Sequence, residues 1–334
     1  MRPFNQALRF IGFVVNIAAW GIGLGLGLPG MAMADGYPTK PITVVAVSPP
    51  GGGDDFTARL FAQQLRESTK QTVMVENIAG GGATIAYTNV ARSAPDGHRL
   101  LISNSVQTSF PALYTNLPFD PVEGFEHIGL IFKTPFAVTV SNRLNVKTLA
   151  EFIQLAKASP GKLNFGSGGS GTGNHLAGEI FKNITGTDIV HVPFKGAGPA
   201  MVALLGGQID VMFATLTTGG LAGHHASGGV RILAISDDRR ALSLPSIPTA
   251  AEAGLPGYMT SIWWAVSAPK GVPADVVERL NREIKQMVKS PAVMQRFNDM
   301  GAIPLGTSAA EAKELIARET KSMSAFVTSL GLKP

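Results

Sequence analysis

The sequence predicts a two-lobed α/β fold, and three features of the chain support this prediction. Short apolar runs alternate with stretches of helical spacing, which is typical of α/β proteins, and the alternation occurs twice. Two extended apolar segments, residues 136–140 and 262–266, are the expected crossings between lobes. The C-terminal stretch is mostly helical and is expected to return to the first lobe. The predicted parts are residues 35–137 plus 259–334 for lobe 1 and residues 138–258 for lobe 2.

The individual elements follow from the spacing of apolar residues. Ala58, Phe61, Ala62 and Leu65 recur at helical intervals and predict a helix over residues 55–68. Apolar runs, several of them β-branched, predict strands at residues 42–47, 73–76, 99–103, 163–165, 189–192, 209–213 and 230–235. Further helices are predicted around residues 149–156, 177–184, 277–287 and from a capping box at Ser308 and Glu311 onward. The alternation of strands and helices predicts mostly parallel sheets.

The N-terminal segment has the three parts of a secretory signal peptide. Arg2 and Arg9 precede an apolar, glycine-rich run at residues 10–28, and the small residues Ala32 and Ala34 follow. We expect residues 1–34 to be a signal peptide cleaved after Ala34, which implies a periplasmic protein. The alternative is a membrane anchor, because the run is near the length that spans a bilayer. The chain has no cysteine, which excludes lipid attachment at a cysteine.

The charge of the chain argues against a nucleic-acid partner. The formal net charge is +5, and loss of Arg2 and Arg9 with the leader lowers it to +3. Beyond the pair Arg239 and Arg240 there is no run of basic residues. This weak positive balance is compatible with an anionic small ligand.

The first glycine-rich loop follows the first predicted strand and precedes a helix. Gly51, Gly52 and Gly53 leave backbone N–H groups uncovered at a helix N-terminus, an arrangement that binds anions without basic side chains. Asp54 and Asp55 come next, and either is a candidate N-cap. Asp55 is favoured as a cap over a direct ligand contact, and both residues remain candidates for the binding site.

Other loops that end predicted strands offer similar chemistry. The loop at residues 166–175 combines glycines, hydroxyl groups and one imidazole at a helix N-terminus. Because such loops lie at one edge of a parallel sheet, ligands are expected there. Lys195, on a neighbouring loop, either faces the cleft or is solvated. The candidate ligand-binding residues outside the first loop are Asn104, Ser105, Ser167, Gly168, Ser170, Gly171, Thr172, His175 and Lys195.

Enzyme motifs are weak in this sequence. Residues 166–171 match G-x-G-x-x-G with Asp188 downstream, but a single match in a glycine-rich loop is poor evidence for a nicotinamide cofactor. Ser170 and His175 lie in one loop, but no G-x-S-x-G elbow occurs. The histidines are scattered and H-E-x-x-H is absent. We therefore expect no catalytic residue, metal or cofactor, with an exported hydrolase as the remaining enzymatic alternative.

Many short segments of the chain match one protein family in order and spacing. They include residues 37–42 (YPTKPI), 49–55 (PPGGGDD), 75–77 (VEN), 94–97 (APDG), 111–114 (PALY), 160–164 (PGKLN), 175–179 (HLAGE), 191–193 (HVP) and 204–208 (LLGGQ). In these segments the chain resembles the periplasmic solute-binding proteins of tripartite tricarboxylate transporters, the Bug proteins. The likeness extends over residues 35–334. It departs from the family pattern at Asp54, Phe110 and Ala214.

The resemblance implies a type II periplasmic-binding-protein fold, also called a Venus flytrap, with the ligand cleft between its lobes. It implies capture of a small organic carboxylate and delivery to a membrane permease, or alternatively to a sensor without its own permease. An acidic Asp54 would repel a carboxylate or contact an amine, and Phe110 would suit a less polar acid. The family's carboxylate-holding positions correspond to Gly51, Gly52, Gly53, Asp55, Ser167, Ser170, Thr172 and His175.

Overall fold

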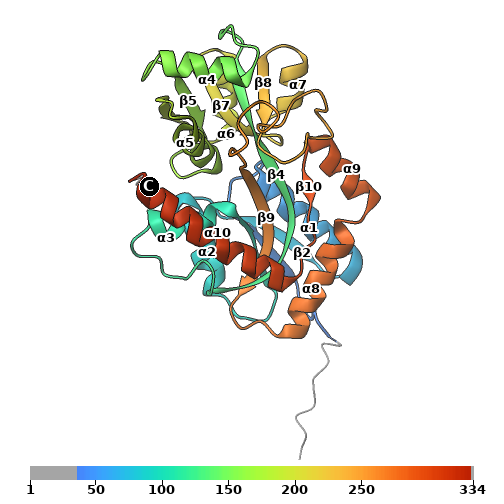
Figure 1. Cartoon of the computed structure of the whole chain (residues 1–334). Coiled ribbons are helices and arrows are strands. Elements are labelled where there is room, and N and C mark those ends of the chain that lie inside the picture. Colours follow the sequence, from blue (N-terminus) through green and yellow to red (C-terminus); the bar gives the residue numbers. More distant parts are fainter. Residues whose placement is uncertain (1–35, 332–334) are drawn as a thin grey trace, which may run out of the picture. The chain divides into compact units, whose positions relative to one another are not determined.

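A computed structural model describes residues 36–331 of the chain (Figure 1). The predicted signal peptide and its cleavage site after Ala34 lie outside the described residues. From Gly36 onward the chain forms one compact unit. Within the described residues no helix is both long and apolar enough to cross a membrane.

The first sheet contains the three strands predicted in the first block. These strands are β1 (Ile42–Ala46), β2 (Val73–Asn77) and β3 (Arg99–Asn104), and β1 pairs in parallel with both others. Next to β3 lies the antiparallel strand β9 (Ser261–Pro269), which in turn pairs with β4 (Phe125–Ser141). The short β10 (Ile303–Pro304) pairs with β4. Because β1, β2 and β3 run in parallel, the loops that follow them lie at one edge.

The second sheet begins on the same long strand. The N-terminal part of β4 pairs with β9, whereas residues 136–141 pair with β7 (Val211–Thr215) and β8 (Val230–Ile235). Strand β5 (Asn164–Ser167) then pairs in parallel with β7 and with β6 (Val190–Pro193). Figure 1 shows β4 passing from one lobe into the other. The two-lobed α/β fold is thus confirmed, and the lobe boundaries at residues 137/138 and 258/259 stay predictions.

The helices cover the faces of the two sheets. Those of the first sheet are α1 (Gly53–Thr69), α2 (Thr84–Ala91), α3 (Phe110–Leu113), α8 (Ala274–Met287), α9 (Pro291–Met300) and α10 (Ala309–Ser329). Those of the second are α4 (Leu149–Ala158), α5 (Gly173–Thr185), α6 (Ala197–Leu205) and α7 (Leu221–Ala226). Two short 3₁₀ helices, η1 (Gly81–Ala83) and η2 (Ser105–Ser109), complete the set. The predicted capping box of Ser308 and Glu311 is confirmed at the start of α10.

Both faces of the first sheet are buried at β1 and β3, which is why these two strands read as mostly apolar runs, whereas the edge strand β2 has an exposed face. In β1, Val44 packs in one hydrophobic cluster and Val45 in another on the opposite face. Each such fully buried valine contributes about 1.5–3 kcal/mol relative to exposure. Trp263 and Trp264 on β9 also enter clusters on opposite faces, so both tryptophans pack in the core.

The structure corrects three sequence-based expectations. The sheets are mixed rather than mostly parallel, because the crossing strands β4 and β9 pair antiparallel with their neighbours. The N-cap of α1 is Gly52, and Asp54 and Asp55 lie in the first turn instead. Phe110 is buried among aromatic rings rather than exposed to a ligand, since it packs edge-on against Tyr87 at 5.1 Å.

Candidate functional site

Hydrogen bonds to the Asp55 carboxylate fix the conformation of the first glycine loop, residues 48–52. One carboxylate oxygen of Asp55 accepts hydrogen bonds from the Gly51 N–H and from Arg59 Nε, both at 3.0 Å. The other oxygen accepts from Asn77 Nδ2 at 3.0 Å, and Asn77 also donates to the Ser48 carbonyl. Burial opposes ionisation, but these donors outweigh it and hold the pKa of Asp55 below its ordinary value. Asp55 therefore acts on the conformation of the loop.

Gly53 is required by the packing of the loop against β9. A Cβ atom at Gly53 would lie 2.6 Å from Cζ2 of Trp264. The same indole donates its Nε1–H to Asp54 Oδ1 at 2.9 Å. Because Gly53 has no side chain, the first turn of α1 can pack directly against the indole ring of Trp264. Gly51, by contrast, has a φ of 88° and lies at the exposed tip of the loop.

Asp54 and Asn104 connect the first glycine loop with the segment at the end of β3. Asn104 Nδ2 donates to Asp54 Oδ1 at 2.7 Å, and Asn104 Oδ1 accepts from the Val106 N–H at 3.0 Å as the N-cap of η2. Burial raises the pKa of Asp54, while the hydrogen bonds from Asn104 and Trp264 partly offset that shift. Both polar atoms of the Asn104 side chain are thus engaged with the protein, and Ser105 beside it is half-buried.

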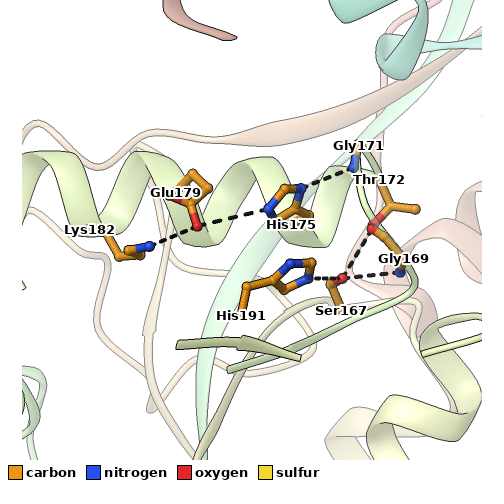
Figure 2. A network of polar contacts seen from close by, with 8 residues as sticks. All are labelled: Ser167, Gly169, Gly171, Thr172, His175, Glu179, Lys182 and His191. Carbon is orange, nitrogen blue, oxygen red and sulfur yellow. Dashed lines mark hydrogen bonds and ion pairs between the residues drawn. The ribbon is translucent and has the colours of Figure 1, made fainter. Parts of the chain in front are cut away.

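The second glycine loop, residues 167–172, is supported by two stacked histidines (Figure 2). The rings of His175 and His191 lie 3.9 Å apart, centroid to centroid, at an angle of 17°. His175 Nδ1 accepts the Gly171 N–H at 3.0 Å, and His191 Nε2 lies 2.6 Å from Ser167 Oγ. Because the N–H of Gly171 needs a lone pair on His175, the histidine is neutral in this arrangement.

Burial explains the protonation of both histidines. Desolvation, reinforced by Lys182, lowers the pKa of His175 to about 4, and desolvation together with His175 does the same for His191. Glu179 lies near, with 3.9 Å between His175 Nε2 and its Oε1, but that oxygen also pairs with Lys182 Nζ at 3.0 Å. The pair therefore stays neutral at physiological pH and supports the loop through hydrogen bonds.

Some predicted residues of the second glycine loop are buried at its base, the lower level, and others lie nearer its exposed tip, the upper level. Ser167 and His175 are buried, and Ser167 Oγ also accepts the Gly169 N–H at 3.1 Å. Thr172 Oγ1 donates to the Gly169 carbonyl at 2.7 Å, whereas Ser170 is exposed at the tip. The lower level shapes the loop. The N–H groups of Gly169, Gly171 and Thr172 are bonded within this lobe, so the group that the upper level presents is the exposed Ser170 hydroxyl.

The loop before α6 lies directly against the second glycine loop. The Gly196 N–H donates to the Gly168 carbonyl at 3.2 Å, and a Cβ at Gly168 would lie 3.1 Å from the Ala197 nitrogen. A side chain at Gly168 would therefore require the loop before α6 to shift by a few tenths of an ångström. Lys195 is exposed on the same loop, and the structure records no ion pair for it within residues 36–331.

A cavity of about 210 Å³ opens between the two lobes. Ser105 is the one predicted site residue that lines it. The other predicted residues do not line it: Gly51, Gly52, Gly53, Asp54, Asp55, Asn104, Ser167, Gly168, Ser170, Gly171, Thr172, His175 and Lys195. Sequence reasoning missed its other walls, which come from β4, α5, the segment before β9 and the C-terminal helix. The remaining lining residues are Val106, Thr108, Phe136, Gly173, Leu176, Ala177, Ile180, Met259, Thr260, Ser261, Glu319, Ser322 and Met323.

Comparison with known proteins places this geometry in one family. The family model "Tripartite tricarboxylate transporter family receptor" matches residues 57–332. Protein BugT of Bordetella pertussis is 34% identical over 320 residues, covering 93% of this chain and 97% of its own.

Solved structures agree with this match. Rpa4515 of R. palustris, solved with adipate, is 30% identical, covers 88% of this chain and 98% of its own, and superposes with a TM-score of 0.80. MatC of Rhodopseudomonas palustris, solved with bound malate, is 29% identical over 87% of this chain and 100% of its own, with a TM-score of 0.78. The periplasmic binding protein BugD is 31% identical, covers 89% of this chain and 100% of its own, and gives a TM-score of 0.79. This chain belongs to the tripartite tricarboxylate transporter receptor family and is a solute-binding protein rather than an enzyme.

Proposed function

We propose that this protein is a periplasmic receptor that captures a small organic carboxylate between its two lobes. The observation that carries the proposal is the cavity between the lobes, which Ser105 of η2 and Gly173 of α5 line from opposite lobes. Related receptors have been solved with adipate and with malate, both carboxylates. The cavity is smaller than the pockets of about 300–1,000 Å³ that hold drug-sized ligands, as a small acid requires.

Backbone groups supply the affinity for the anion in this proposal. The N-cap of α5, Thr172, makes no side-chain capping bond, so the first N–H groups of this 13-residue helix remain available to a carboxylate. Ser170 is exposed two residues before this N-cap and lies outside the lining of the cavity, and in this proposal closure of the lobes brings its hydroxyl group to the ligand. We place the carboxylate here, with the predicted residues Ser167 and His175 acting through the conformation of the loop.

Ligand binding is coupled to closure of the lobes in this proposal. A ligand that contacts both lobes binds the closed form better than the open form and shifts the population toward it. The closed form then docks on a membrane permease of the tripartite tricarboxylate type. Export requires the leader at residues 1–34, cleaved after Ala34.

A thermal-shift screen of mono-, di- and tricarboxylic acids tests the proposal. A true ligand at 100 times its Kd stabilises the native state by about 2.7 kcal/mol, so the melting temperature rises clearly. The variant Ser170→Ala is expected to weaken binding, and Thr72→Ala, at an exposed position on the opposite edge of the first sheet, serves as the matched control. If no acid raises the melting temperature, carboxylate capture is wrong. If Ser170→Ala binds like the control, the carboxylate lies elsewhere.

A further inference from the structure

The cavity between the lobes has an asymmetric lining of charge. Among its lining residues Glu319 of α10 is the one ionisable side chain, and no lysine, arginine or histidine is present. Five hydroxyl-bearing residues and an apolar set make up most of the remaining wall. A ligand enclosed here therefore meets one carboxyl group and no side-chain cation.

Glu319 is anchored through only one of its two oxygens. Trp263 Nε1 donates to Oε2 at 2.7 Å, which fixes the carboxyl group at the cavity wall. Within residues 36–331, Oε1 has no recorded hydrogen-bond partner, and the residue is half-buried. Desolvation raises the pKa of Glu319, and the Trp263 hydrogen bond and the charges of Arg318 and Lys133 oppose that shift.

The nearby cations do not neutralise Glu319 by direct contact. Lys133 lies 3.2 Å from Asp237 and forms its recorded ion pair there. Arg318 is exposed, and no ion pair is recorded for it within the described chain. The carboxyl group thus lines the cavity with one oxygen that has no protein partner within residues 36–331 and is accessible to solvent or to a ligand.

A second carboxylate of a ligand would be disfavoured in this cavity. It would lie close to Glu319 at reduced dielectric without a counter-ion, and like charges in such a setting repel strongly. An ammonium group would instead complete the hydrogen bonding of Oε1 with a charge-assisted bond. The apolar side chains Val106, Leu176 and Met323 line the same cavity and suit a short hydrocarbon spacer.

We infer that the ligand is an aminocarboxylate, whose ammonium group pairs with Glu319 while its carboxylate lies at the N-terminus of α5. This inference rests on the proposed capture of a carboxylate and narrows its ligand class. It separates this chain from the relatives solved with adipate and malate, neither of which carries an amine.

Isothermal titration calorimetry with matched ligands tests the inference. The panel contains linear acids of three to six carbons, each as the monocarboxylate, the dicarboxylate and the aminocarboxylate, at pH 8 to favour the ionised carboxyl group. Wild-type protein is expected to bind one aminocarboxylate at least about tenfold more tightly than the dicarboxylate of equal length. This is the affinity ratio that one charge-assisted hydrogen bond provides.

Glu319→Gln is the diagnostic variant, because its amide oxygen still accepts from Trp263. It is expected to lose that preference. Glu314→Gln, on the exposed face of the same helix and without an ion-pair or hydrogen-bond partner among residues 36–331, is expected to retain it. A dicarboxylate that binds wild type as tightly as its amino counterpart, or a ratio unchanged in Glu319→Gln, overturns the inference but leaves carboxylate capture intact. If no member of the panel binds, both the inference and the proposed function are wrong.

Discussion

Replacing Gly53 by alanine tests how the first glycine loop is built. The new Cβ would lie 2.6 Å from Cζ2 of Trp264, a buried ring stacked on Phe132 with centroids 4.7 Å apart. Restoring an ordinary contact of about 3.5 Å requires the ring or the helix to move by about 0.9 Å. That movement also stretches the hydrogen bond from Trp264 Nε1 to Asp54.

The expected cost of this substitution is moderate. Overpacking of this kind costs about 1–3 kcal/mol, and the gain from replacing glycine in a helix offsets about 0.5–1 kcal/mol. We therefore expect a net loss of up to about 2.5 kcal/mol, or a fall of up to roughly 4 °C in Tm. Urea unfolding followed by tryptophan fluorescence measures the loss.

Gly223→Ala is the matched control, because Gly223 lies in α7 with no atom within 4 Å of its Cβ position. The control is expected to match or slightly exceed wild type. Equal stability of Gly53→Ala and Gly223→Ala would refute the argument that Gly53 is required by close packing.

Three further outcomes follow from the loops. Asp55→Ala removes the charged acceptor shared by Gly51, Arg59 and Asn77. We expect a loss of about 1.5–3 kcal/mol in chemical unfolding and weaker ligand binding, and unchanged values contradict the anchoring role. Ser167→Ala removes the partner of His191 in a buried site, with an expected cost of about 1–3 kcal/mol in urea unfolding, and a neutral substitution contradicts this. The pKa of His175 is about 4 in the folded state and about 6.5 in the unfolded state. The stability that depends on this difference is therefore fully present above about pH 6.5. It declines as the pH falls from 6.5 to 4, by up to about 3 kcal/mol from this residue. Unfolding free energies that stay level between pH 6.5 and 4.5 would contradict the buried, neutral histidine.

The sequence predicted the elements well where apolar spacing was regular, and less well where the chain crosses between lobes. Strand β4 continues through Pro135, a residue that normally argues against a strand. The strand stays extended because it pairs with β9 up to Pro135 and with β7 from Phe136 onward. Pairing of this kind depends on partners distant in sequence, and no local pattern encodes it.

The glycine loops were predictable because they directly follow strands and precede helices. The cavity wall supplied by α10 was not predictable, because in the sequence Glu319 and Ser322 look like the polar face of a surface helix. Only the return of the C-terminal helix to the first lobe brings them to the cavity. Phe110 shows the converse error, in which an expected ligand contact is a core residue.

The most direct test of carboxylate capture compares acids with their carboxamides in isothermal titration calorimetry. The amide keeps the size and shape of the acid and removes only the negative charge. The account predicts that at least one small acid binds and that its carboxamide binds at least about 100-fold more weakly, since the N–H groups of the α5 terminus select an anion. Equal affinity for acid and amide, or no binding by any acid, would contradict the account.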